Sequence, residues 1–312
     1  MTQLLHPAEP FGEVNVHPQP DGSLAIVATV LMEPDIEGAR CGLALDGSAS
    51  MRSLYGDCGA VSPLLRHSGD NIVQPVARSL AAYLARFSAT GTARLVYWSC
   101  GPDGGGVEEI ADVGAGQAHA LAIAGPRELP WGRQTRLLPP VRHFVENLFR
   151  DARWAFCVLV TDGRIDDLDA VKEFSWSLAR DVAAGRRGPV KLVMLGLGRR
   201  VDESQLAQLD SLFEGSGLRG SDGEAVDLWD YKLAREMRHV QEVFAEVVSD
   251  DALVAPGGRV LDGEGHVAAD FTAGLPARLR FTLPAGSTAF TLELQGHRIV
   301  QELGGAFSPA RA

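Results

Sequence analysis

The ten residues 41–50, CGLALDGSAS, join an uninterrupted apolar run to a group of small polar side chains. Three later segments are apolar in the same way: 93–99 (ARLVYWS), 154–161 (WAFCVLVT) and 190–197 (VKLVMLGL). A strand that is apolar at nearly every position is buried on both faces, which is typical of a parallel sheet covered by helices. Apolar residues at helical spacing occupy the segments between them: 70–88, 137–150, 166–184 and 202–213. We therefore predict an α/β fold with a doubly wound, mostly parallel sheet and a last helix over 231–249.

The two ends of the chain have the pattern of β structure instead. Residues 13–17 and 23–32 flank the turn signal Pro20-Asp21-Gly22, as the strands of a hairpin do. Short alternating runs follow near the C-terminus, at 278–283, 288–294 and 297–302. Two or three isolated strands are marginally stable in water, so both ends are expected to combine in one small β-sandwich-like unit. This predicts an N-terminal β segment over 1–37, a central domain over 38–252 and a C-terminal β unit over 253–312, entered through a linker at 255–258 (APGG).

The charge balance restricts the partners of this chain. Lys and Arg number 29 against 40 Asp and Glu, which gives a net charge of −11. An acidic protein lacks the basic surface that displaces counterions from nucleic acid or attracts an anionic membrane, so neither partner is expected. The N-terminal residues MTQLLHPAEP lack the charged and apolar regions of a signal peptide, and no stretch approaches the length of a transmembrane helix. We expect a cytoplasmic protein.

Polar side chains follow two of the apolar runs and precede one predicted helix. They are Asp46, Ser48 and Ser50 after the first run, Thr135 before the helix at 137–150, and Asp162 after the third run. Ligands bind at the carboxyl ends of the strands in open parallel sheets, so these side chains belong to the expected site. Hard oxygen donors without Cys or His favour Mg²⁺, Mn²⁺ or Ca²⁺ over zinc. Each residue also has a structural alternative, as an N-cap for Asp46, Ser48 and Thr135 and as a turn for Asp162-Gly163.

Taken together, these five residues resemble a known metal site. Asp46-x-Ser48-x-Ser50, then Thr135, then Asp162 within VTDG, is similar to the metal-ion-dependent adhesion site (MIDAS) of von Willebrand factor A (vWA) domains. The resemblance covers about residues 38–250 and implies the Rossmann-like vWA fold of a bacterial stand-alone protein. It departs from a minimal vWA domain in two stretches that are longer, 51–69 and 100–134.

The resemblance also implies a role for each residue. Ser48 and Ser50 would donate hydroxyl oxygens directly to a Mg²⁺ or Mn²⁺ ion, with Ca²⁺ as a further candidate. Thr135 would bind directly in one state and through water in another, and Asp46 and Asp162 would act through water or by orienting the serines. Neutral direct ligands leave the ion with charge and an open position, which an Asp or Glu side chain of a protein partner would fill.

The implied function is metal-dependent protein binding without enzymatic activity. Similar bacterial stand-alone domains are partners of AAA ATPases and of tellurium-resistance or stress-operon proteins. Two alternatives remain: a metal-dependent hydrolase acting on a phosphoester, and a metal-free interaction scaffold. The hydrolase reading lacks a general base near the metal, a basic clamp for phosphate and a GxSxG nucleophile motif.

Two further expectations concern the surroundings of the site. Residues 100–134 are rich in Gly and Pro with weak periodicity, which predicts a long functional or mobile loop. Trp131, just before Thr135, is expected to lie at the rim of the binding face. Asp166, Asp167 and Asp169 are predicted to cap the helix that they begin, where acidic groups suit the helix dipole.

Overall fold

The computed structural model describes most of the chain. It covers residues 2–4, 7–8, 10–30, 38–57, 70–198, 200–220, 223, 225–236, 253–255, 257–272, 274–294 and 296–303. The chain divides into two compact units, one of residues 36–243 and the other of residues 1–35 with 244–312. Each unit has its own apolar core.

A six-stranded sheet forms the centre of the first unit, in the order β6-β5-β4-β7-β8-β9. The strands are β4 (Ala39–Asp46), β5 (Thr92–Cys100), β6 (Gly106–Gly114), β7 (Trp154–Thr161), β8 (Val190–Gly196) and β9 (Trp229–Leu233). All neighbouring pairs are parallel except β5 with β6, which is antiparallel. The prediction of an α/β fold with a mostly parallel sheet is confirmed, and its four apolar runs are four adjacent strands.

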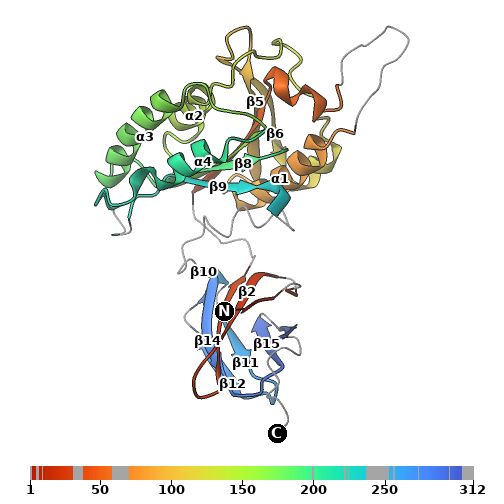
Figure 1. The fold of residues 1–312 in the computed structure, drawn as a ribbon, viewed down its shortest axis with the longest axis vertical. Helices are drawn as coiled ribbons and strands as arrows, with labels where there is room; N and C mark the ends of the chain where they lie inside the picture. Colours follow the sequence, from red (N-terminus) through yellow and green to blue (C-terminus); the bar gives the residue numbers. More distant parts are fainter. Residues whose placement is uncertain are drawn as a thin grey trace. The chain divides into compact units, whose positions relative to one another are not determined.

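Helices pack against this sheet. They are α1 (Val73–Phe87), α2 (Leu138–His143), α3 (Leu168–Ala183) and α4 (Glu203–Asp210), and a π-helical turn over Phe144–Leu148 continues α2. Alternate strand residues, such as Ala44, Val96 and Leu159, form one core with residues of α2 and α3. Helix α1 packs on β4 and β5. Figure 1 shows α2 and α3 together on one side of this unit, away from α1.

Residues 100–134 do not form the long loop that the sequence predicted, so this prediction was wrong. Residues 106–114 form the edge strand β6, and Ala115–Ala120 form a 3₁₀-helix. The strand has the sequence GVEEIADVG and is largely half-buried or exposed, so it lacks the apolar run that identifies its neighbours. Its pairing with β5 (Arg94 with Asp112, Leu95 with Ala111) supplies the stability that the local sequence does not.

The helix predicted over 231–249 does not begin at residue 231. Residues 229–233 form β9, which pairs with β8 from Leu192–Trp229 to Gly196–Leu233, and a short 3₁₀ turn occupies Ala234–Glu236. Burial of Trp229 against the sheet and the ladder to β8 override the helical spacing of this segment. Residues 237–249 lie outside the described part of the chain.

The second unit is built of antiparallel strands. One sheet has the order β1-β2-β3-β14, another β12-β11-β15-β16, and β10 pairs with β13. The bounds are β1 (Thr2–Gln3), β2 (Phe11–Pro18), β3 (Leu24–Val30), β10 (Leu253–Ala255), β11 (Gly258–Leu261), β12 (Val267–Phe271), β13 (Leu275–Pro276), β14 (Arg278–Leu283), β15 (Ala289–Leu294) and β16 (His297–Glu302). Strand β3 of the N-terminal hairpin pairs with β14 along its whole length. Phe290 contacts Phe11 and Phe281 edge to face in the shared core, at centroid distances of 5.4 and 5.0 Å.

The predicted linker at 255–258 contributes to strands instead: Ala255 ends β10 and Gly258 begins β11. Among the described helices, none combines the length and the apolar character needed to cross a membrane.

Candidate metal centre

Asp46 lies at the carboxyl end of β4, where it is fully buried. Its Oδ1 accepts the backbone N–H of Ser48 at 2.7 Å, and its Oδ2 accepts the hydroxyl of Thr161 at 2.6 Å. Thr161 is the last residue of the parallel neighbour β7, so the carboxylate joins the ends of two strands. Burial raises the pKa of Asp46 to about 7, although the hydrogen bonds from Thr161 and Ser48 oppose this rise.

The three residues Ser48, Ser50 and Asp162 form a continuous chain of polar contacts. The Oγ atoms of Ser48 and Ser50 are 3.0 Å apart, and Ser50 donates its hydroxyl to Oδ1 of Asp162 at 2.7 Å. Asp162 is buried, and this burial raises its pKa against the effects of the Ser50 hydrogen bond and of Arg200. The hydroxyl proton of Ser50 points to a carboxylate, so an oxygen lone pair remains for another ligand.

Thr135 reaches the same place from the segment before α2. A Cβ atom added to Gly163 would lie 3.5 Å from Oγ1 of Thr135 and 3.7 Å from Oγ of Ser50. Both hydroxyl oxygens therefore border the same small volume beside Asp162. The structure brings together all five residues that the sequence singled out, Asp46, Ser48, Ser50, Thr135 and Asp162.

Two glycines allow the loops of the site to touch. Ala49 donates its N–H to the carbonyl of Gly132 at 2.7 Å, and Gly132 donates to the carbonyl of Gly47 at 3.0 Å. A Cβ at Gly132 would lie 1.8 Å from the backbone oxygen of Ser99, and a Cβ at Gly47 would lie 2.9 Å from Sγ of Cys100. These contacts place the segment of Thr135 beside that of Ser48 and Ser50.

We expect Gly132→Ala to destabilise the first unit by about 3 kcal/mol, because a methyl group there forces backbone segments apart. Urea unfolding followed by circular dichroism measures this loss. Gly116→Ala is the matched control, since a Cβ there meets no atom within 4 Å. Equal stability of the two variants would show that the loops have room to separate.

The acidic residues at the start of α3 serve the Thr135 segment rather than their own helix. Asp166 accepts the N–H of Thr135 at 2.8 Å, and Asp167 accepts those of Leu137 and Leu138 at 2.7 and 3.1 Å. Helix α3 has no side-chain cap. Asp167 occupies the N-cap position of α3 and Asp169 its first turn, as predicted, but the carboxylates of Asp166 and Asp167 bond the segment before α2 instead of capping α3 by a hydrogen bond.

Trp131 packs between the loops beside the site. Its ring meets that of Tyr55 edge to face at 5.3 Å, and the guanidinium of Arg52 lies 5.9 Å from its centroid. Tyr55 in turn donates its hydroxyl to the backbone oxygen of Asp46 at 3.0 Å. Trp131 is half-buried, so it forms part of the wall between these loops.

Glu108 fixes the segment that leads to Trp131. Its buried carboxylate accepts three consecutive backbone N–H groups, those of Arg127, Glu128 and Leu129, at 2.8 to 3.0 Å. Sequence reasoning missed Glu108, Thr161 and Tyr55, whose contacts join residues far apart in the chain. Only the position of Thr161 directly before Asp162 gave a local signal.

The donor set of this cluster fits a divalent cation. Among the described residues, neither Asp46 nor Asp162 forms an ion pair, and their hydrogen bonds come from neutral donors. Two buried carboxylates, each with a raised pKa, gain stability from a nearby positive charge. Within the described ranges no three His, Cys, Asp or Glu side chains are grouped for a metal. The cluster itself has only two carboxylates, and its other oxygens are hydroxyls.

Comparisons with known proteins add no family assignment. No family model matches the sequence, and no curated protein matches it. Among solved structures, the chain is similar to the D319A mutant of the PilB minor pilin from Streptococcus sanguinis, at 12% identity. The match covers 78% of each chain with a TM-score of 0.38, a level that defines neither a fold nor a function.

Proposed function

We propose that residues 38–252 form a vWA domain whose MIDAS holds Mg²⁺ or Mn²⁺ and captures an Asp or Glu side chain of a protein partner. The observation that carries this proposal is the pair of buried carboxylates, Asp46 and Asp162, joined by hydrogen bonds to serine hydroxyls and without an ion-pair partner among the described residues. The location at the carboxyl ends of β4 and β7 supports it, since ligands bind at such edges in parallel sheets.

The residues of the proposed site have different roles. Ser48, Ser50 and Thr135 would hold the ion through their hydroxyl oxygens. Asp162 orients Ser50 by accepting a hydrogen bond from its hydroxyl, and Asp46 fixes the backbone at Ser48 by accepting its N–H. When bound, the ion supplies the positive charge that attracts a carboxylate of the partner. An acidic protein with an acidic partner side chain needs such a cation between them.

Partner binding is favoured over hydrolysis by how the carboxylates are used. Both oxygens of Asp46 accept hydrogen bonds, and both oxygens of Asp167 accept backbone N–H groups, with Arg136 a further 3.9 Å contact. A general base needs a free oxygen within reach of the water that it activates. The engagement of both Asp46 oxygens supports a binding role, and the classes of partner suggested by the resemblance, AAA ATPases and stress-operon proteins, remain candidates.

Calorimetric titration of the metal-stripped protein tests the proposal. We expect one Mg²⁺ or Mn²⁺ to bind per chain, and Ca²⁺ to be compared in the same series. p-Nitrophenyl phosphate tests the hydrolase alternative, and we expect no turnover above that of a variant without the serine hydroxyls. Absence of saturable metal binding would contradict the proposal, and metal-dependent turnover would replace it with the hydrolase.

A further inference from the structure

A polar pocket lies at the opposite end of β4 from the candidate metal centre. It has a volume of about 350 Å³, and its lining includes Arg40, Ser88, Thr90, Thr92, Arg94 and Asp112. Arg40 stands near the start of β4, and Asp46 ends the strand. At about 3.3 Å per residue the strand separates them by roughly 20 Å, so the two sites share no residue.

The pocket lies beside the π-helical turn that follows α2. Gly42 pairs with Arg94 of β5, and a Cβ at Gly42 would lie 2.4 Å from the ring of Phe144. Phe144 begins the π-helical turn, in which Phe149 donates its N–H to the carbonyl of Phe144 at 2.8 Å. The same turn contributes Asn147 and Leu148 to the pocket. Such π-helical turns occur frequently at functional sites.

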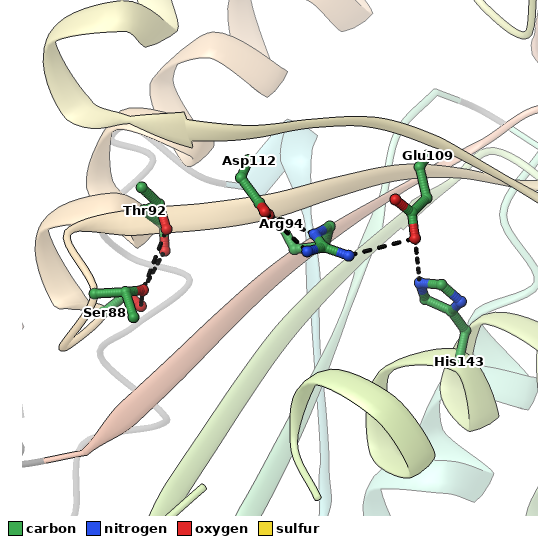
Figure 2. A network of polar contacts seen from close by, with 7 residues as sticks. Ser88, Thr92, Arg94, Glu109, Asp112 and His143 are labelled. Carbon is green, nitrogen blue, oxygen red and sulfur yellow. Dashed lines mark hydrogen bonds and ion pairs between the residues drawn. The ribbon is translucent and has the colours of Figure 1, made fainter.

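Arg94 is held in place by acidic residues of β6, as Figure 2 shows. Its Nε and Nη2 bind the two carboxylate oxygens of Asp112, the latter at 2.8 Å, and its Nη1 lies 3.3 Å from Oε1 of Glu109. Glu109 also lies 3.9 Å from Nε2 of His143 on α2. A guanidinium has five N–H donors, so three contacts fix its orientation and two donors remain.

Three hydroxyl groups line another side of the pocket and are linked to one another. Oγ of Ser88 lies 2.9 Å from Oγ1 of Thr90, which lies 3.2 Å from Oγ1 of Thr92 (Figure 2 labels Ser88 and Thr92). Each hydroxyl can donate or accept a hydrogen bond, so these linked hydroxyls can reorient and donate one to a bound acceptor. Thr92 and Arg94 are two residues apart in β5, so their side chains lie on the same face of the sheet.

Arg40 supplies a positive charge that no described residue neutralises. It is half-buried, and within the described part of the chain it has no hydrogen bond or ion pair. Asp112 and Glu109 both contact Arg94, so Arg40 is the arginine of the lining that has no acidic contact among the described residues. A half-buried guanidinium without a partner is stabilised by a bidentate oxyanion.

We propose that this pocket binds the phosphate group of a phosphomonoester, with Arg40 as its charged anchor and with the Arg94 guanidinium and the Thr92 hydroxyl as further donors. The donors come from β4 and β5, and the three peripheral oxygens of a phosphate can accept from all of them. A planar carboxylate has only two oxygens and therefore matches fewer of these donors. The volume lies at the lower end of small-molecule sites, which leaves room for the group esterified to the phosphate.

Calorimetry in phosphate-free buffer tests this site on the full chain. The probes are inorganic phosphate, glycerol 3-phosphate and phosphoserine with blocked termini, and acetate at equal ionic strength serves as the reference anion. We expect at least one phosphate compound to bind tenfold or more tightly than acetate. Tighter binding of glycerol 3-phosphate identifies a free metabolite as the source, whereas tighter binding of phosphoserine identifies a modified side chain.

Variants locate the binding. Arg40→Gln should weaken phosphate binding at least tenfold, and Thr92→Val, which keeps a β-branched side chain in the strand, should weaken it severalfold. Arg186→Gln removes the same charge from an exposed arginine paired with Asp181 and should leave binding unchanged. Melting temperatures without phosphate verify that each variant is folded. Equal binding of acetate and phosphate, or unchanged binding by Arg40→Gln, would overturn the proposal.

Discussion

Replacing Asp46 with asparagine is expected to weaken Mg²⁺ binding about 100-fold, because hydrogen-bonded partners of metal ligands contribute up to that factor to affinity. Asparagine keeps the shape of the side chain. Its carbonyl can accept the N–H of Ser48, and its amide can donate to the Thr161 oxygen, which reverses the direction of that hydrogen bond but keeps both groups in contact while the charge is lost. Alanine would leave both buried donors unpaired and would destabilise the fold as well.

Calorimetry with Mg²⁺ and Mn²⁺ measures this effect, and urea unfolding verifies that the variant is folded. Asp103→Asn is the matched control: it removes the same charge from a side chain that is 73% exposed. We expect the control to bind metal like the wild type. An Asp46→Asn variant that is folded and binds metal with unchanged affinity would exclude this carboxylate from the centre.

The double substitution of Ser48 and Ser50 by alanine is expected to abolish metal-dependent capture of a protein partner. It removes two of the three hydroxyl oxygens of the cluster and leaves the buried carboxylates unchanged. Immobilised protein is incubated with lysate in Mg²⁺, and proteins released by EDTA are quantified by mass spectrometry. We expect the double variant to retain less than a tenth of the wild-type signal.

Ser53→Ala is the control for this experiment, because Ser53 is an exposed serine in the same short helical turn, Ala49–Ser53. A purified partner then allows the affinity to be measured with and without Mg²⁺. Partner capture that persists in EDTA, or in the double variant, would favour the metal-free scaffold over the proposed function.

The strands of the parallel sheet could be predicted from sequence because each is apolar along most of its length. Burial of β4, β7 and β8 on both faces requires such runs. The candidate centre was predictable for the same reason, since Asp46 and Asp162 directly follow two of these strands. Their proximity depends only on the strands being parallel neighbours.

The elements that sequence reasoning missed depend on partners far along the chain. Strand β6 has an exposed, acidic surface and is stabilised by its ladder to β5, including the contacts of Arg94 with Asp112. Residues 229–233 have aromatic and apolar residues that suit either a helix or a strand, and the edge of β8 decides between them. Local spacing carries no information about either pairing.

The hydrogen bonds of the centre were missed for the same reason, because they join residues that are far apart in the sequence. The bond from Thr161 to Asp46 joins residues 115 positions apart, and that from Ser50 to Asp162 joins residues 112 apart. The use of Asp166 and Asp167 to hold the start of α2 could not be distinguished from helix capping, because both roles need a carboxylate at the same place in the sequence.

The pairing of β3 with β14 has a consequence for how the protein is made. Leu24 pairs with Leu283, and translation at 5–20 residues per second delivers the second strand roughly 13 to 50 s after the first. During that time residues 36–243 leave the ribosome as one continuous stretch and can complete their own core. The N-terminal hairpin meanwhile waits with apolar Val16 and Ile26 lacking their final neighbours. Synthesis therefore sets the order of assembly: the interrupted β unit closes last, after the continuous α/β unit has left the ribosome.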